Sequence, residues 1–131
     1  MRFLLDTNII SELLSNPSGR AADRYLANLG ACFTSVIVAS ELRYGIAKYP
    51  DRTGALDARR FLDELPIAEF EPPADEFYGR VRAELERAGT PIGANDMFIA
   101  AHALALDCTL VTANEREFGR VAGLRIENWV A

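Results

Sequence analysis

The chain has 131 residues, of which half are hydrophobic and a quarter are charged, and its formal net charge is −5. This length allows one hydrophobic core and predicts a single domain over residues 1–131. The composition is unlike that of disordered, collagen-like or membrane-spanning chains, and the negative charge argues against a protein that coats nucleic acid. A charge follows the first short apolar run at the N-terminus, so the chain lacks a signal-peptide core and we expect a cytoplasmic protein.

Apolar residues in the first half alternate between the short runs of buried strands and the three-to-four-residue spacing of amphipathic helices. Turn residues separate these patterns: an Asn-Pro-Ser-Gly stretch closes the first helix, and Ser35 can cap a later one. The predicted elements are a strand at 2–5, a helix that starts near Ile9, a helix at 21–29, a strand at 31–34 and a helix at 36–49.

The second half continues this alternation, with prolines and Gly89 as breaks. Strands that alternate with helices predict a three-layer α/β/α fold with a mainly parallel central sheet, because parallel neighbours need crossover helices that cover both faces. The predicted elements are a helix at 56–65, a strand at 67–70, helices at 77–88 and 96–107, a strand at 109–112, a short helix around Glu117 and a strand at 124–126.

Three carboxylates occupy positions where a solvated surface charge is not expected. Asp6 ends the first strand, where α/β proteins bind ligands; it could cap the next helix, but Asn8 could do so equally well. Glu41 lies on a helix with almost no polar stripe, which predicts partial burial beside a partner, either a site or an arginine. Asp96 begins the most apolar helix on its buried side, where a helix-dipole contribution of about 0.3–1 kcal/mol is small against the cost of desolvation.

Local pattern does not distinguish Glu117 from its acidic neighbours. Asp107 and Glu115 lie nearby, and a glutamate beside Arg116 is most often part of a solvated helix face. Glu117 therefore cannot be selected from the residues around it.

The single histidine and the two cysteines predict structural roles. His102 lies in an apolar helix, which favours a packed, hydrogen-bonded side chain over a general base. Cys32 and Cys108 have no familiar zinc-binding spacing with His102. Because both cysteines lie in apolar stretches, we expect reduced, buried thiols in preference to a Cys-His nucleophile pair.

Carboxylates brought together repel one another, so a fold that gathers several needs cations or raised pKa values. Oxygen ligands favour Mg²⁺ or Mn²⁺ over zinc, which usually recruits His or Cys. Such ions can activate a water and stabilise the departing oxygen of a phosphodiester. No glycine-rich phosphate loop is present, which disfavours a nucleotide-triphosphate or dinucleotide enzyme. The residues therefore predict a metal-dependent hydrolase built around Asp6, Glu41 and Asp96.

Four short stretches resemble the PIN-domain ribonucleases, and among them the VapC-type toxins of bacterial toxin-antitoxin pairs. They are residues 4–10 (LLDTNII), 40–45 (SELRYG), 92–96 (IGAND), and 110–114 (LVTAN) with Glu117-Phe118. The resemblance spans essentially the whole chain. It implies a PIN-like α/β/α domain and an Mg²⁺- or Mn²⁺-dependent endoribonuclease in which water is the nucleophile.

The same resemblance implies residue roles and partners. It implies a homodimer without a membrane, inhibition by a small cognate antitoxin that covers the active site, and cleavage of structured RNA. Residues 114–121 are similar to the subgroup that cuts initiator tRNA in its anticodon loop. By this resemblance the catalytic and metal-binding residues are Asp6, Glu41, Asp96 and Glu117, and the supporting residues are Asn8, Thr112 and Asn114.

Two other functions remain open at the level of sequence. A phosphatase or phosphotransferase could use Asp6 as a nucleophile, although haloacid-dehalogenase-like enzymes have Asp-x-Asp after the first strand and this chain has Asn8. Alternatively, a non-catalytic acidic cleft could bind a partner that carries arginine.

Overall fold

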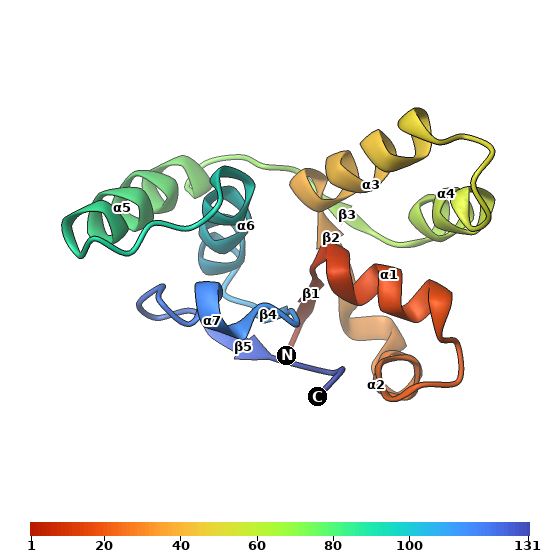
Figure 1. Ribbon diagram of the computed structural model, residues 1–131. Helices are drawn as coiled ribbons and strands as arrows, with labels where there is room; N and C mark the ends of the chain where they lie inside the picture. The colour runs from red at the N-terminus through yellow and green to blue at the C-terminus, as the bar shows by residue number, and fades with distance from the viewer.

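Five parallel strands form the central sheet of the computed structural model, which describes residues 1–131 (Figure 1). Their order in the sheet is β3-β2-β1-β4-β5, and every neighbouring pair is parallel. The strands are β1 (Phe3–Leu5), β2 (Cys32–Ser35), β3 (Ile67–Ala68), β4 (Thr109–Val111) and β5 (Arg125–Glu127).

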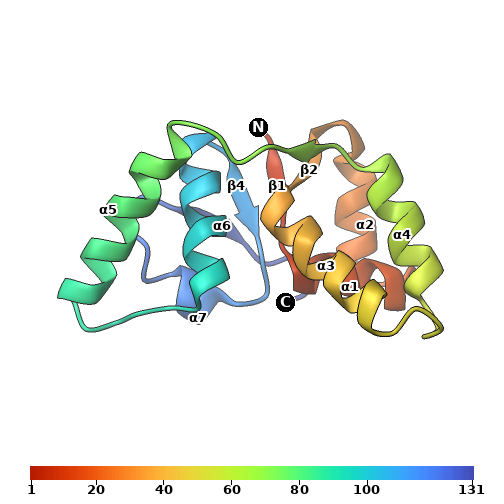
Figure 2. The same cartoon turned by 90° about the horizontal axis from the view of Figure 1, so that it is seen from above.

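Helices lie in two groups with β1, β2 and β4 between them (Figures 1 and 2). The predicted α/β fold with a parallel central sheet is confirmed. No helix has the length and apolar character needed to cross a membrane. One group contains α1 (Thr7–Ser15), α2 (Arg20–Ala27), α3 (Val36–Lys48) and α4 (Ala55–Glu64), and the other contains α5 (Ala74–Arg87), α6 (Ala94–Ala105) and α7 (Glu115–Phe118).

Some predicted boundaries differ from the structure for local reasons. The strand predicted at 67–70 ends at Ala68, because its partner β2 ends at Ser35 and leaves no further strand with which to pair. The helix predicted to open at Asp96 begins two residues earlier, at Ala94, so Asp96 lies within its first turn. A short 3-10 turn at Leu29–Ala31 also replaces the end of the helix predicted at 21–29.

The two central strands are buried on both faces. Leu4 of β1 lies opposite Leu110 of β4 in the register, and both side chains are fully buried. This burial explains the continuous apolar runs of these strands, because a strand covered by helices on both faces has no polar side. Near the C-terminus, Trp129 packs against Phe3 with 5.2 Å between ring centroids.

The strand order places the ends of β1 and β4 at a topological switch point. From β1 the chain continues to β2 and β3 on one side, and it later returns to β4 and β5 on the other. Connections from β1 and β4 therefore diverge, and the carboxyl ends of strands at such a point are where α/β sheets generally bind ligands. Asp6 directly follows β1 and Thr112 directly follows β4. The first turn of α6 lies at the same edge, because α6 leads back to the start of β4.

Candidate active site

Asp6 is held at the end of β1 by a set of hydrogen-bond donors. Its side chain is only 4% exposed. Oδ1 accepts from the backbone N–H of Thr7 at 2.8 Å, and Oδ2 accepts from the Thr112 hydroxyl at 2.8 Å and from Asn8 Nδ2 at 3.2 Å. The expectation that Asn8 could cap α1 is wrong, because Asp6 is the cap. Asn8 instead links Asp6 to the loop after β4, because its Oδ1 accepts a hydrogen bond from the Ala113 N–H at 2.9 Å.

The environment of Asp6 opposes its ionisation. Burial raises the pKa of Asp6 above its usual value, and the hydrogen bonds from Thr112 and Thr7 only partly offset this effect. The nearby charge of Glu41 raises the pKa of Asp6 further. A buried carboxylate beside a second one is the arrangement that a cation would stabilise.

Glu41 lies on α3 and is half-buried, as predicted. The Thr7 hydroxyl donates to Oε1 at 2.5 Å, and Asn95 Nδ2 donates to Oε2 at 3.3 Å. The alternative of an arginine partner is wrong, since no arginine or lysine lies within 4.0 Å of this carboxylate. Sequence reasoning did not single out Thr7 and Asn95, although each directly precedes or follows an acidic residue of the site.

Asp96 and Glu117 form a coupled pair between α6 and α7. Burial, a hydrogen bond with Glu117 and the charges of Asp6, Glu117 and Glu41 together raise the pKa of Asp96 to about 7. Hydrogen bonds from Asn114 and Asp96 lower the pKa of Glu117. The interaction between the two side chains therefore favours protonation of Asp96 and ionisation of Glu117. The electrostatics of Asp96 thus link all four carboxylates, which we call the acidic cluster: Asp6, Glu41, Asp96 and Glu117.

The structure distinguishes Glu117 from the two acidic residues near it in the sequence. Asn114 Nδ2 donates to Glu117 Oε2 at 2.9 Å, and the Asn114 backbone N–H donates to the Thr112 hydroxyl at 3.0 Å. Asp107 instead pairs with Arg125 at 3.1 Å, while Glu115 accepts from Asn128 at 3.3 Å. Of these three acidic residues, only Glu117 interacts with Asp96.

The acidic cluster fits a hard divalent cation by the chemistry of its donors. In this structure no three acidic, histidine or cysteine side chains are close enough together to coordinate one metal ion by themselves. Mg²⁺ does not require three such ligands, because it keeps several waters and takes one or two carboxylates together with substrate phosphate oxygens. All donors of the cluster are oxygens, and none of the four carboxylates pairs with an arginine or lysine within 4.0 Å.

His102 is a structural residue, as predicted. Its ring is buried, with Nδ1 2.7 Å from Ser35 Oγ and Nε2 2.9 Å from the Glu69 carbonyl. Ser35 Oγ accepts from the Ile37 N–H at 3.0 Å and so caps α3, which directs its own proton to His102 Nδ1. Nε2 then carries the other proton and donates to Glu69. Burial lowers the pKa of His102, in keeping with this neutral ring.

The cysteines are also structural. Cys32 and Cys108 are free and buried, and burial raises the pKa of each thiol to about 11. Neither thiol ionises appreciably at neutral pH, and neither contacts His102, whose ring nitrogens bind other partners. The pair of groups needed for cysteine nucleophilic catalysis is therefore not assembled.

Comparison with known proteins identifies the family. The model of the PIN domain matches residues 3–124. The chain is 39% identical to Ribonuclease VapC2 of Haemophilus influenzae over 99% of each protein, and 37% identical to the tRNA(fMet)-specific endonuclease VapC of Shigella flexneri over 98% of each. Its fold is similar to that of a chain in the VapBC2 complex of Rickettsia felis bound to a promoter DNA fragment, with a TM-score of 0.90, 35% identity and coverage of 98% and 99%.

These similarities extend over the four segments that carry the acidic cluster, since the matched residues 3–124 include all of them. The carboxyl ends of β1 and β4, the start of α6 and the face of α3 thus come together in the fold that these relatives share. The chain belongs to the PIN-domain family, within its group of VapC ribonucleases.

Proposed function

We propose that this chain is a metal-dependent endoribonuclease, that it hydrolyses RNA phosphodiester bonds at the acidic cluster, and that it acts as the toxin of a toxin-antitoxin pair. All 131 residues would serve as one nuclease domain. The observation that carries the proposal is the convergence of Asp6, Glu41 and Glu117 on Asp96 from separate elements of the fold, which raises the pKa of Asp96 to about 7. Strong mutual perturbation among carboxylates in a crevice is typical of a catalytic centre. Relatives named as ribonucleases over the whole length support the choice of RNA.

Mg²⁺ or Mn²⁺ is the cofactor that these donors would accept, and Asp6, Glu41, Asp96 and Glu117 would hold it either directly or through its bound waters. When bound, such an ion polarises a water for attack and neutralises the charge on the departing oxygen. It would also remove the repulsion that raises the pKa values of Asp6 and Asp96.

The other residues hold the carboxylates in place. Thr112 and Asn8 orient Asp6 through its Oδ2, and Asn114 orients Glu117. Thr7 and Asn95 do the same for Glu41. Asp96 has the higher pKa of the pair, so its ionised form is the better suited to accept the proton that the attacking water loses as its oxygen bonds to phosphorus.

A cognate antitoxin, a homodimer and a tRNA substrate complete the proposal. The solved relatives from Rickettsia felis and Salmonella typhimurium are VapBC assemblies, at 35% identity each, which supports an antitoxin partner. The name of the Shigella flexneri relative specifies tRNA(fMet), which supports initiator tRNA as a substrate.

An aspartate-nucleophile phosphatase is less well supported. Both oxygens of Asp6 are engaged by donors from Thr7, Asn8 and Thr112, and the residue is almost completely buried. A nucleophile needs an exposed lone pair directed at the substrate. A non-catalytic acidic cleft would not require the pKa of one carboxyl to be raised to about 7.

RNA cleavage with Mg²⁺ and with EDTA tests the proposal. We expect cleavage by the parent chain to stop in EDTA and to return with Mg²⁺ or Mn²⁺, and we expect Asp6→Ala and Asp96→Asn to lose it. Calorimetric titration with Mg²⁺ alone gives a second readout, in which both variants should bind the ion more weakly. Undiminished cleavage in chelator or in these variants would refute the proposal.

A further inference from the structure

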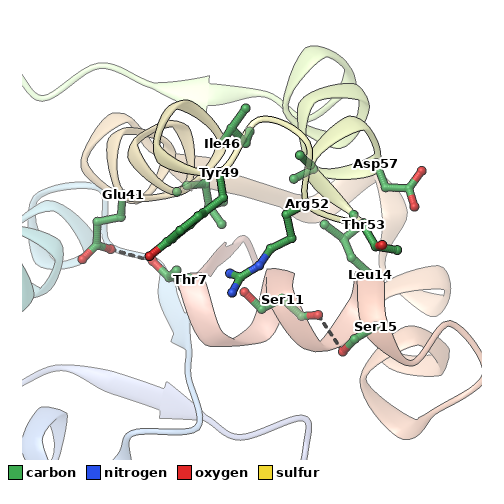
Figure 3. A pocket seen from close by; sticks show the side chains of 15 residues that line it. Thr7, Ser11, Leu14, Ser15, Glu41, Ile46, Tyr49, Arg52, Thr53 and Asp57 are labelled. Carbon is green, nitrogen blue, oxygen red and sulfur yellow. Dashed lines mark hydrogen bonds between the residues drawn. The ribbon is translucent and has the colours of Figure 1, made fainter.

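A groove runs along the molecule from the acidic cluster. It lies between α1, α3 and α4, has a volume of about 760 Å³, and begins at Thr7 and Glu41 (Figure 3). From there it extends past the end of α3 to Asp57 and Ala58 on α4. Its remaining wall combines aliphatic side chains with hydroxyls, namely Leu14, Leu42, Ile46, Ser11, Ser15 and Thr53.

Tyr49 and Arg52 project into this groove between α1 and α3 (Figure 3). Tyr49 follows the last residue of α3 and is 46% exposed. The Arg52 guanidinium lies 4.8 Å from the centre of the Tyr49 ring, and the Lys48 ammonium lies 5.4 Å from it. Neither cation has a carboxylate within 4.0 Å, although Asp57 also lines the groove.

An exposed aromatic ring beside unpaired cations has the chemistry of a single-stranded RNA site. Each nucleotide offers a flat base and, next to it, a negative phosphate; a tyrosine ring or an arginine plane can stack the base, and the cation can bind the phosphate. A volume of about 760 Å³ falls within the usual range of ligand pockets, about 300–1,000 Å³.

We propose that Tyr49 and Arg52 form a single-stranded RNA subsite that holds nucleotides next to the bond cleaved at the acidic cluster. Tyr49 stacks a base and Arg52 binds a phosphate. The groove reaches Glu41, so a strand held at Tyr49 would extend to the acidic cluster. This assignment rests on the proposed ribonuclease function, and it adds to that function a basis for selecting unpaired RNA.

Binding of a fluorescein-labelled single-stranded RNA of about 10 nucleotides tests the subsite. The measurement is fluorescence anisotropy in Mg²⁺ with the Asp96→Asn chain as the parent, so that binding is read without turnover. We expect Tyr49→Ala to weaken binding about tenfold and Tyr49→Phe to leave it near the parent value, because the stacking ring is retained. Arg52→Ala should also weaken binding and reduce the salt dependence of log K by about 0.7, the contribution of one phosphate contact to a single strand.

Two matched controls lie outside the groove. Tyr44 is on α3, is 65% exposed, lies 5.6 Å from the same Lys48 ammonium and lines a different hollow, so Tyr44→Ala removes an equivalent ring from outside the groove. Arg59 is an exposed arginine on α4 that does not line the groove. We expect Tyr44→Ala and Arg59→Ala to bind the RNA as the parent does.

Parent-like binding by Tyr49→Ala and Arg52→Ala would overturn the subsite, and so would equal losses in the controls. Unchanged RNA binding combined with weaker binding of the antitoxin would also overturn it, because the groove would then receive a protein segment. Failure of the nuclease proposal gives a different result: the Asp96→Asn chain would cut the labelled RNA, as seen on a gel. In the otherwise unmutated enzyme, Tyr49→Ala should raise KM with kcat unchanged.

Discussion

Replacing Asp96 with asparagine is expected to stabilise the folded chain at alkaline pH while it abolishes cleavage. In the folded chain, burial and the neighbouring carboxylates raise the pKa of Asp96 from 3.8 to about 7. The folded state therefore binds more protons than the unfolded state between these values, and stability falls as pH rises through about 7. An asparagine side chain is neutral at every pH and avoids this loss.

The pKa values set an upper limit on the effect. Of the interval between 3.8 and about 7, roughly two units lie above pH 5, which corresponds to about 3 kcal/mol at 1.36 kcal/mol per unit. Asp96 is only partly buried, so solvent screening reduces this to about 1–2 kcal/mol. For a chain of 131 residues, that difference raises Tm by roughly 4–8 °C.

Thermal and urea unfolding in EDTA, at about pH 5 and about pH 8, measure this difference. We expect the parent and Asp96→Asn to unfold alike at the lower pH, where the acid and the amide are both neutral, and the variant to be more stable at the higher pH. His102 acts in the opposite direction, because burial lowers its pKa and the stability that its neutral ring provides is lost as pH falls. Both chains contain His102, so the difference between them isolates Asp96.

Mg²⁺ provides an internal check on the same experiment. Added to the parent at about pH 8, it should raise Tm, whereas Asp96→Asn should gain less because one ligand is missing. The reasoning would be refuted if Asp96→Asn lost as much stability as the parent between the two pH values. It would also be refuted if the variant were the less stable chain at about pH 8.

Three other substitutions test how the cluster is built. Glu117→Gln should reduce cleavage about 10- to 100-fold in single-turnover assays, while Glu115→Gln, an exposed neighbour, should leave it within about twofold; equal effects would contradict the selection of Glu117. Thr112→Val removes a buried hydroxyl donor to Asp6, so it should lower the free energy of unfolding in urea by about 1–3 kcal/mol and also reduce cleavage. Thr112→Ser retains the hydroxyl and should behave like the parent; a serine variant as impaired as the valine variant would show that the hydroxyl is not the cause. Ser35→Ala removes the cap of α3 and should lower stability by about 1–2 kcal/mol, so an unchanged denaturation midpoint would count against that role.

Local sequence patterns predicted the elements because each pattern reports on the immediate environment of the backbone. Continuous apolar runs predicted β1 and β4, and Ser35 predicted the start of α3. The same local reasoning was wrong for Asn8. Its side chain could cap α1 in isolation. In the folded chain it instead accepts a hydrogen bond from the backbone N–H of Ala113, in the loop after the neighbouring strand β4.

The sequence by itself determined the α/β architecture and three candidate carboxylates. Glu41 and Asp96 were selected from the apolar helix faces on which they lie, and Asp6 from its position at the end of a strand. Local patterns did not select Glu117; the family resemblance implied it, and the physical reason came only from the tertiary structure, because its distinguishing partner, Asp96, lies on another helix. The groove with Tyr49 and Arg52 likewise arises where α1, α3 and α4 meet. Coulombic coupling and shared hydrogen bonds act between segments that are distant in the chain, so no local window of residues reports them.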